Sequence, residues 1–333
     1  MKTTLIKIIL GLLSFIVILM LAFLAVRKGL FFPKEEPQVS TSKELGLSGE
    51  KSRSRSLKLL FGGDLMFDRH IRLNAQEHGN YNFIFSDLKE LFFGYDLVIA
   101  NLEGPITDSS SISLGTIPGS PENFIFTFDP QVAQVLADHN IRVVCLGNNH
   151  ILNFGQEGLI STRHYLGQNG VASFGFAGDD GGRTLIKELN GFRLGFVNYN
   201  QFILGGLAAA KEDIESLLPD TDWLILYAHW GNEYQPYPQE EIKTLAHQFI
   251  DQGVDLVIGS HPHVVLSSEE YQGKMIYYSL GNFVFDQYFS LETMTGVLVE
   301  VVIDTEKEKI ETREWPIKME KSGKTVLSPS LLL

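Results

Sequence analysis

Cysteine is almost absent from the chain, which has only Cys145 among its 333 residues. A single cysteine excludes an intramolecular disulfide, and it excludes a structural zinc ion held by four thiolates. Cys145 lies in the apolar run IRVVCLG. This setting predicts a small buried apolar side chain, and a catalytic thiol is the alternative.

Positive charge is scarce beyond the N-terminal segment. Residues 1–58 hold ten Lys and Arg against four Glu, a balance of +6, so the formal net charge of −13 leaves −19 on the remaining residues. Because nucleic-acid-binding surfaces are basic, the strong negative charge of the remaining residues argues against nucleic acid as a partner. It is compatible with a pocket that holds cations.

The N-terminal segment carries one long apolar run, Leu5–Val26, interrupted by Lys7, Gly11 and Ser14. About 20 apolar residues span a bilayer. No A-x-A cleavage site follows, so residues 1–28 are predicted to be an uncleaved signal anchor, and a cleaved signal peptide is the alternative. The short N-terminal tail predicts a single-pass protein whose large body lies outside the cytoplasmic membrane.

The rest of the chain is expected to form one domain between two loosely structured segments. Residues 29–56 are rich in Pro, Ser, Gly and charged side chains, a composition that predicts a disordered linker. Residues 57–318 form the predicted domain, since 44% of the chain is apolar, as in globular proteins with a core. Residues 319–333 are expected to be a tail.

Within the predicted domain, short apolar runs are each followed at once by polar residues. LKLLFGGD ends at Asp64, DLVIANLE at Asn101 and Glu103, IRVVCLGNNH at Asn148, Asn149 and His150, DWLILYAHWGNE at His229 and Glu233, VDLVIGSHPH at His261 and His263, and MIYYSLGN at Asn282. Amphipathic helical patterns lie between several runs, at Asp129–Asn140, Gly155–Gln168 and Pro238–Gln252. This alternation predicts an α/β domain, in which ligands bind beyond the carboxyl ends of the strands.

The HPH sequence places two imidazoles two residues apart. In an extended chain such residues point to the same side, and Pro262 favours extended geometry before it. His261 and His263 are therefore expected to present two nitrogens to one point. Structural interpretations stay open for other positions, since Asp64 could be a turn residue and His229 a packed core residue.

The strand-end residues together form a mixed set of oxygen and nitrogen ligands. The candidate metal ligands are Asp64, Glu103, Asn149, His229, His261 and His263. Such a set suits one or two divalent ions (Mn, Zn, Fe or Mg), and two ions about 3.5–4 Å apart would use all six residues. Glu103 is then the candidate bridge, and His150 could protonate a leaving oxygen. His70 is a reserve candidate.

The motifs at these positions are similar to those of the CapA family, named for capsule (poly-γ-glutamate) synthesis, which resembles the calcineurin-like metallophosphoesterases. The matching stretches are GGDLMFDR (62–69), ANLEGPIT (100–107), LGNNHILNFGQEGL (146–159), HWGNEY (229–234), IGSHPHV (258–264) and YSLGNFVFDQ (278–287). The resemblance implies a four-layer α/β/β/α sandwich. It implies the same metal ligands with His150 as the general acid, and supporting roles for Arg69, Asn148, Glu233 and Asn282.

Two positions depart from the phosphoesterase pattern. Met66 stands where D-x-H supplies a histidine, so one metal position lacks a ligand. Asn153 stands where the family's NNHxxD supplies an aspartate, so it can hold His150 by a hydrogen bond without adding charge.

Three functions are compatible with these features. The first is an extracytoplasmic metal-dependent hydrolase or transferase acting on a phosphoester or an anionic polymer. The second is a non-catalytic polymer-binding subunit that works with other capsule-synthesis membrane proteins, and the third is an exported binding domain without metal. The Ser-, Gly- and Pro-rich loop 108–124 follows the Glu103 motif and is a candidate lid.

Overall fold

The computed structural model describes residues 56–176, 182–306 and 309–328. The chain divides into two units, Met1–Lys51 and Ser52–Leu333, and the description below concerns the second. The expected anchor, residues 1–28, and the expected linker up to residue 55 lie outside the described residues. Within the described ranges, no helix is both long and apolar enough to cross a bilayer.

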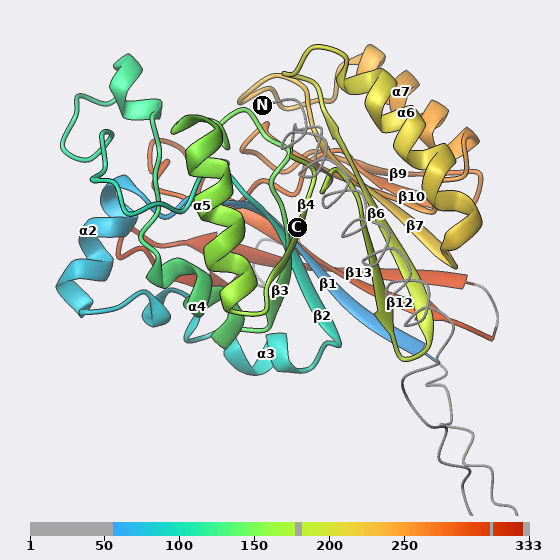
Figure 1. The fold of residues 1–333 in the computed structure, drawn as a ribbon, viewed down its shortest axis with the longest axis horizontal. Coiled ribbons are helices and arrows are strands. Elements are labelled where there is room, and N and C mark those ends of the chain that lie inside the picture. Colours follow the sequence, from blue (N-terminus) through green and yellow to red (C-terminus); the bar gives the residue numbers. More distant parts are fainter. Residues whose placement is uncertain (1–55, 177–181, 307–308, 329–333) are drawn as a thin grey trace, which may run out of the picture. The chain divides into compact units, whose positions relative to one another are not determined.

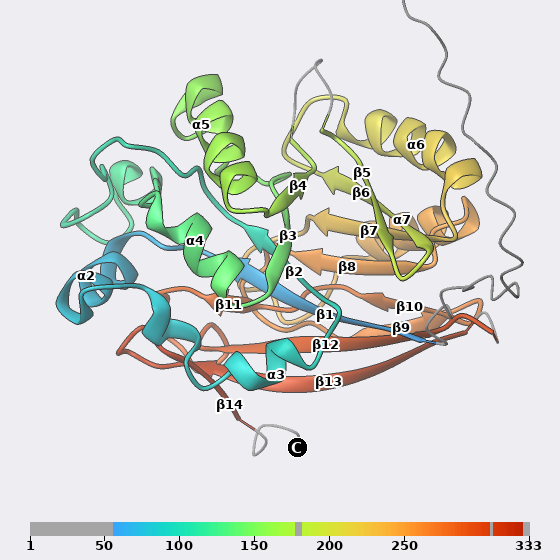
Figure 2. The same ribbon diagram turned by 60° about the horizontal axis from the view of Figure 1, so that its bottom comes forward.

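Two β-sheets form the centre of the second unit (Figure 1 and Figure 2). The first sheet has the order β14 (Thr325–Leu327), β13 (Lys309–Met319), β12 (Thr295–Asp304), β1 (Ser56–Leu65), β2 (Leu97–Leu102), β3 (Ile141–Cys145), β4 (Ala172–Phe174), and β11 (Asn282–Val284) pairs with the end of β1. The second has the order β5 (Leu185–Leu189), β6 (Phe192–Asn200), β7 (Trp223–His229), β8 (Leu256–Ser260), β10 (Lys274–Tyr277), β9 (Ser268–Tyr271).

Helices cover the outer face of each sheet (Figure 2). The first sheet packs against α2 (Arg69–His78), α3 (Lys89–Phe93), α4 (Gln131–Asp138) and α5 (Gly155–Gln168), and the second against α6 (Gly206–Leu217) and α7 (Glu240–Asp251). Single-turn 3₁₀ helices are η1 (Asn82–Phe85), η2 (Pro121–Phe124) and η3 (Leu218–Asp220). The strand–helix alternation predicts the α/β class, and the two-sheet sandwich is the arrangement that the family resemblance implies.

Side-chain alternation along the strands divides the core into layers. On β2, Val98 and Ala100 pack toward the helices, whereas Leu97 and Ile99 pack between the two sheets. Because both faces of these strands are buried, they need continuous apolar sequence, which explains runs such as LVIA. Cys145 is buried in the layer between the sheets, which confirms its prediction as an apolar core residue.

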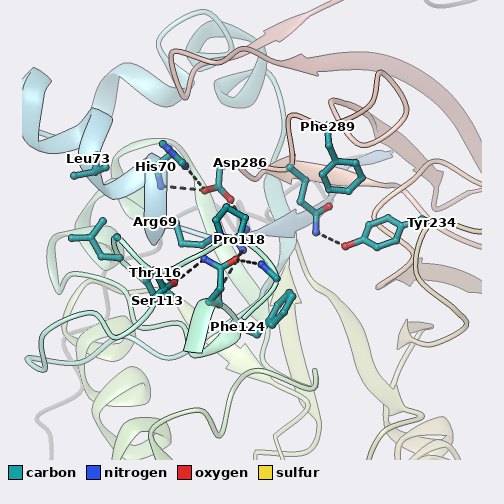
Figure 3. A pocket seen from close by; sticks show the side chains of 15 residues that line it. Arg69, His70, Leu73, Ser113, Thr116, Pro118, Phe124, Tyr234, Asp286 and Phe289 are labelled. Atoms are coloured by element: carbon teal, nitrogen blue, oxygen red, sulfur yellow. Dashed lines mark hydrogen bonds and ion pairs between the residues drawn. The ribbon is translucent and has the colours of Figure 1, made fainter. Parts of the chain in front are cut away.

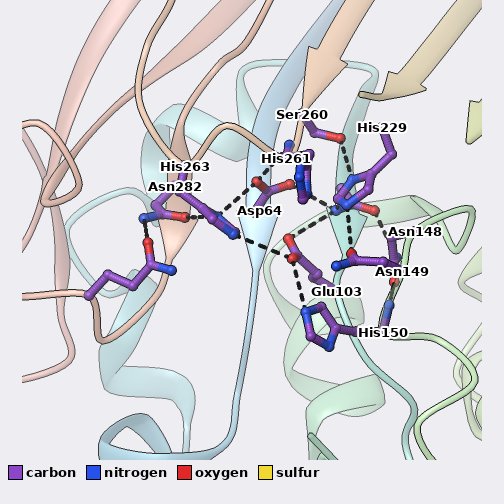
Figure 4. Close-up of polar contacts among 12 residues, drawn as sticks. Asp64, Glu103, Asn148, Asn149, His150, His229, Ser260, His261, His263 and Asn282 are labelled. Carbon is purple, nitrogen blue, oxygen red and sulfur yellow. Dashed lines mark hydrogen bonds and ion pairs between the residues drawn. The ribbon is translucent and has the colours of Figure 1, made fainter. Parts of the chain in front are cut away.

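Parallel pairing sets the position of the site. Strands β1 to β4 are mutually parallel, and so are β6, β7, β8 and β10. Within each sheet the carboxyl ends of these strands therefore lie at one edge, and side chains that follow them from both sheets meet there (Figure 4).

The segment after Lys318 differs from the expected tail. Thr325–Leu327 forms β14, which pairs with Ile317–Met319 of β13, and the Thr325 hydroxyl donates to the Phe283 carbonyl at 2.7 Å. A three-residue strand at the edge of a sheet buries few side chains, so β14 leaves no long apolar run in the sequence that would have predicted it.

Candidate metal centre

The strand ends bring the predicted residues together (Figure 4). Asp64 lies at the end of β1, Glu103 follows β2, His150 follows β3, His229 ends β7, and His261 follows β8. Asn149 and His263 join them in the same cluster, and Asn282 at the start of β11 lies beside it. The side chains of Asp64, Glu103 and His229 are fully buried.

A chain of side-chain amides fixes the oxygen side of the cluster. Asn101 donates from Nδ2 to Oδ1 of Asp64 at 2.8 Å. Asn148 donates to Oδ1 of Asn101 at 3.0 Å and to the Leu102 carbonyl at 2.8 Å, while its own oxygen accepts the backbone N–H of His150 at 3.1 Å. Asn148 is therefore a positioning residue, and Asn101 is one that the sequence analysis leaves out of its site. Asn101 lies near the end of β2, two residues before Glu103, and this position is the available signal.

Asn282 determines the tautomer of His263. Its Nδ2 donates to the Thr293 carbonyl at 2.8 Å, so its oxygen faces Nδ1 of His263, at 3.0 Å. Nδ1 therefore carries the proton, and the Nε2 lone pair faces Oε1 of Glu103 at 3.7 Å. Nδ1 also lies 3.4 Å from Oδ2 of Asp64.

Ser260 orients His229 in the same way. The Ser260 hydroxyl donates to the Ala228 carbonyl at 3.1 Å, so its oxygen accepts from Nδ1 of His229, at 2.9 Å. Nε2 then carries a lone pair, and it lies 2.9 Å from Oδ1 of Asn149. Two electron-pair donors facing each other at this distance match two ligands of one cation.

The HPH segment reaches the cluster by a turn, so the expected extended geometry is wrong. Strand β8 ends at Ser260, and His261 and His263 have φ of 96° and 58°, in the left-handed region. The turn lets the backbone N–H of His261 donate to Oδ2 of Asp64 at 3.2 Å. The expected convergence of the two rings still holds, with centroids 5.9 Å apart.

Glu103 places a carboxylate oxygen where no hydrogen-bond donor reaches it. Its Oε1 is buried and has no hydrogen-bond partner within the described part of the chain; it lies 3.9 Å from Nε2 of His150 and 3.7 Å from Nε2 of His263. Burial and the neighbouring Asp64 carboxylate raise the pKa of Glu103 well above its ordinary value. Such an oxygen favours a proton or a cation beside it.

Three imidazoles of the cluster, those of His150, His229 and His261, are held in their neutral form by burial. Burial lowers the pKa of His150 to about 4 and that of His261 to about 3, and burial also places the pKa of His229 well below its ordinary value. Asn153 accepts the backbone N–H of Phe126 at 2.9 Å, so the same oxygen faces Nδ1 of His150, at 3.2 Å. Asn153 thus holds His150 as the sequence suggests it can.

The donor set fits a divalent metal ion. Three groups place their ligand atoms within 4.8 Å of one another: Glu103, His229 and His261; Asp64, Glu103 and His263; and Glu233, His261 and His263. Like Oε1 of Glu103, Nδ1 of His261 is buried and has no hydrogen-bond partner among the residues that the structure describes. Neutral imidazoles and carboxylates suit Zn or Mn. Glu233, expected only to support the site, thus reaches ligand distance.

Met66 contributes nothing to this donor set. Its side chain is buried in the core between the first sheet and its helices, and its sulfur accepts the backbone N–H of Asp68 at 3.0 Å. The first-strand position therefore supplies one ligand, Asp64, rather than two.

Arg69 and His70 lie beside the cluster, outside the three ligand groups. Arg69 forms an ion pair with Asp286 and donates to Oδ1 of Asn123 at 3.2 Å. His70 is 66% exposed, and its Nδ1 lies 3.2 Å from Asp286. The reserve candidate His70 is thus separate from the ligand groups. Asp286, which the sequence analysis does not single out, holds both side chains in place.

Two solved structures share the fold. A hypothetical protein from Thermus thermophilus aligns with a TM-score of 0.50 at 18% identity, over 78% of this chain and 99% of that one. A Staphylococcus aureus protein assigned as a 5′-nucleotidase aligns with a TM-score of 0.50 at 12% identity, over 82% of this chain and 54% of that one.

Two sequence relatives are named for PGA or capsule biosynthesis. The chain is 28% identical over 300 residues to the PGA biosynthesis protein CapA of Bacillus subtilis, covering 85% of this chain and 73% of that protein. It is 26% identical over 268 residues to the capsule biosynthesis protein CapA of Bacillus anthracis, covering 74% of this chain but only 64% of that protein. The family model for the bacterial capsule synthesis protein PGA_cap matches residues 58–287, more than half of the chain, so the protein belongs to this family.

Proposed function

We propose that this member of the capsule synthesis family is a divalent-metal-dependent hydrolase of the metallophosphoesterase type. Its substrate would be an anionic polymer or a phosphoester of capsule biosynthesis, a context that the names of the Bacillus relatives support. The apolar run in residues 1–28 supports a membrane anchor, with the domain outside the cytoplasmic membrane.

The observation that carries this proposal is the buried Oε1 of Glu103, which has no hydrogen-bond partner among the described residues and lies near the rings of His150 and His263. A carboxylate without a hydrogen-bond donor is costly to bury, and a cation offsets that cost. Asp64, Glu103, His229, His261 and His263 would hold the ion, and Glu233 and Asn149 lie within reach of the same histidines.

The chain's own residues supply the proton chemistry. Because Nδ1 of His150 faces the Asn153 oxygen, the Nε2 lone pair points toward Glu103 and can take a proton and return it to a leaving oxygen. A divalent ion, when bound, would supply Lewis-acid activation of water and of an anionic substrate oxygen. The Phe126 ring, whose centre lies 4.4 Å from that of the His150 ring, shields one side of the imidazole from water.

The test is hydrolysis of bis(p-nitrophenyl) phosphate by the full chain with Mn²⁺. His150→Gln is expected to lower kcat by about 10²–10⁴ while metal binding is kept, since general acid–base catalysis contributes that factor. His164→Gln, at an exposed position on α5, is the matched control. Equal rates for the wild type and His150→Gln would contradict the proposal.

A non-catalytic polymer-binding subunit is the second candidate, favoured by the buried Met66 in place of a metal-binding histidine. This function predicts bound metal without turnover of any ester. Under this function, cells carrying His150→Gln would make as much polymer as wild-type cells. If the protein is instead a hydrolase essential for synthesis, these cells would make less polymer.

A further inference from the structure

The ligand group around Asp64 is one side chain short. Asp64, Glu103 and His263 form this group, in which the ligand atoms lie within 4.8 Å of one another. The histidine that a D-x-H motif would add is replaced by Met66, whose side chain is fully buried in the core. Because Zn²⁺ usually takes four ligands and Mn²⁺ more, an ion in this group has room for another donor.

Glu233 offers a carboxylate at this point. It lies on the loop after β7 of the second sheet, whereas Asp64 and Glu103 come from the first. A Glu233 oxygen lies within 4.8 Å of ligand nitrogens of both His261 and His263. Since His263 also belongs to the group of Asp64 and Glu103, Glu233 reaches the same histidine as the incomplete group.

A nitrogen of His261 lacks a partner in the same place. His261 is only 4% exposed, and its Nδ1 has no hydrogen-bond partner in the described ranges of the chain. The centre of the Phe202 ring lies 4.3 Å from that of the His261 ring and covers part of it. An unpaired buried nitrogen is unfavourable, and a metal ion is a partner that a neutral imidazole can bind. This observation, which is independent of the carboxylates, also indicates a cation beside Glu233.

Backbone contacts hold Glu233 against the HPH turn. The N–H of Tyr234 donates to the Pro262 carbonyl at 2.9 Å. Tyr234 has a φ of 60°, in the left-handed region that a residue with a Cβ rarely adopts. Before it, Gly231 has a φ of 84°, and its N–H donates to Oε1 of Gln201 at 2.8 Å. Because these contacts fix the backbone on both sides of Glu233, less conformational entropy is lost when its carboxylate binds an ion.

A cavity of about 590 Å³ borders the same loop (Figure 3). Tyr234 lines this cavity, and its hydroxyl accepts a hydrogen bond from Nε2 of Gln287 at 3.1 Å. Loop 108–124, the candidate lid, forms another wall, and its mobility stays a prediction. Because Tyr234 directly follows Glu233, an ion held by Glu233 would border a space of ligand size.

The carboxylates of the site carry more negative charge than one divalent ion balances. Asp64, Glu103 and Glu233 bear three formal negative charges within reach of His263. The charge of Arg69, beside the cluster, is already paired with Asp286. One divalent ion would leave a net negative charge, and the remaining carboxylates would repel each other. Two ions would leave a net positive charge, which favours an anionic substrate.

We propose that Glu233 is a metal ligand that takes the place of the histidine missing at Met66, so that the site holds two divalent ions. The second ion would be bound by the side chains that meet at the His263 ring, which are Asp64, Glu103, Glu233 and His263 itself. The inference rests on the proposed function for the presence of metal, but it concerns the number of ions and their ligands and requires no turnover.

The test counts the Mn²⁺ ions that the chelator-treated full chain binds, by calorimetric titration. The wild type is expected to bind about two ions per chain and Glu233→Ala about one. Glu241→Ala removes the same charge at an exposed position on α7 and is the matched control. Glu233→His exchanges one kind of metal ligand for another, so it is expected to restore the second ion, which a merely structural role of the carboxylate would not predict.

Electron paramagnetic resonance adds a readout that does not depend on affinity. Two neighbouring Mn²⁺ ions couple magnetically, so the loaded wild type is expected to give a coupled spectrum and Glu233→Ala the spectrum of isolated ions. Thermal unfolding of the metal-depleted proteins checks the fold, and Glu233→Ala is expected to keep the wild-type Tm.

The outcomes separate this inference from the hydrolase proposal. Two bound ions, one of which is lost in Glu233→Ala, without hydrolysis of any ester would support the inference and contradict the proposed function. Hydrolysis by a protein that binds one ion, or by a protein whose ion count is the same in Glu233→Ala, would support the function and overturn the inference. Loss of both ions in a Glu233→Ala protein of unchanged Tm would overturn the assignment of Glu233 to a second position.

Discussion

At the scale of single residues, the partners behind each histidine decide what the site can bind. An oxygen of Asn282 faces Nδ1 of His263, that of Ser260 faces Nδ1 of His229, and that of Asn153 faces Nδ1 of His150. In each ring the lone pair on Nε2 is therefore available to a ligand. Partners of this kind tune metal affinity as much as they orient the ring.

Removing the partner of His263 tests this role. Asn282→Ala is expected to weaken Mn²⁺ binding about 10–100-fold, because Nδ1 of His263 loses the acceptor that fixes its tautomer. Calorimetric titration of the metal-depleted protein measures the change. Gln248→Ala, an exposed amide on α7, serves as the control, and an unchanged affinity in Asn282→Ala would refute the role of Asn282.

Adding a charge behind His150 tests the opposite direction. Asn153→Asp is expected to raise the pKa of His150 from about 4, because a carboxylate at Nδ1 stabilises the imidazolium. The Phe126 N–H can still donate to the new side chain. An NMR titration of the histidine rings measures the pKa, and a value at or below that of the wild type would contradict this account.

Residue motifs predicted which side chains meet, but not how they are held. Each predicted ligand lies at a strand end, where apolar sequence stops, so the sequence pattern located it. Asn101 holds Asp64 and Ser260 holds His229 by hydrogen bonds between neighbouring strands. Which strands are neighbours depends on the order of the sheet, which the sequence motifs do not give. The turn at His261 depends on the Asp64 oxygen, a partner far away in sequence.

At the scale of elements, close backbone contact positions the strand ends. A Cβ at Gly63 would lie 1.8 Å from the Gly281 carbonyl oxygen, and the backbone N–H of Asp64 donates to that same oxygen at 3.2 Å. The residue before the metal ligand therefore has no room for a side chain.

A pair of glycine substitutions tests this contact. Gly63→Ala is expected to lower the free energy of unfolding by about 2–4 kcal/mol, because backbone must move to admit the methyl group. A methyl group at Gly167 in helix α5 would meet no atom of the described residues within 4 Å beyond its own turn of helix, so Gly167→Ala is expected to be neutral or to stabilise by up to about 1 kcal/mol. Urea unfolding compares the two, and a mild effect of Gly63→Ala would argue against tight packing at the end of β1.

Element prediction succeeded where the local signal was strong. The expected helix Gly155–Gln168 matches α5, whereas the expected Asp129–Asn140 and Pro238–Gln252 are each trimmed at both ends in α4 and α7. The sequence analysis does not predict helices α2, α3 and α6: α2 is mostly polar, α3 has only five residues, and α6 opens with the mostly small residues GLAAA. Strand β14 depends on pairing with β13, which short-range sequence does not reveal.

At the scale of the whole molecule, the buried imidazoles make stability depend on pH. In the unfolded chain histidine has a pKa of about 6.5, so below that pH the unfolded state binds protons that folded His150 and His261 do not. Each of the two is expected to cost about 2 kcal/mol of stability by pH 5. The pKa of Glu103 is raised in the folded protein, so folded Glu103 takes up a proton and offsets part of this loss of stability. The pKa of His229 is lowered, so His229 adds to the loss.

Metal-depleted protein should therefore lose stability as the pH falls from 7 to 5. Thermal unfolding across this range measures the loss, and His150→Gln should reduce it by about 2 kcal/mol, since that residue no longer titrates. A Tm that stays constant or rises toward pH 5 would contradict the buried, neutral state of these rings.

The central claim is that distant strand ends form one cation site around Glu103. Calorimetric titration of the chelator-treated full chain with Mn²⁺ tests it most directly, with Glu103→Gln beside Glu241→Gln, an exposed control on α7. The account predicts that the wild type and Glu241→Gln bind at least one ion per chain and that Glu103→Gln binds far more weakly. No binding by the wild type, or equal binding by Glu103→Gln, would contradict it.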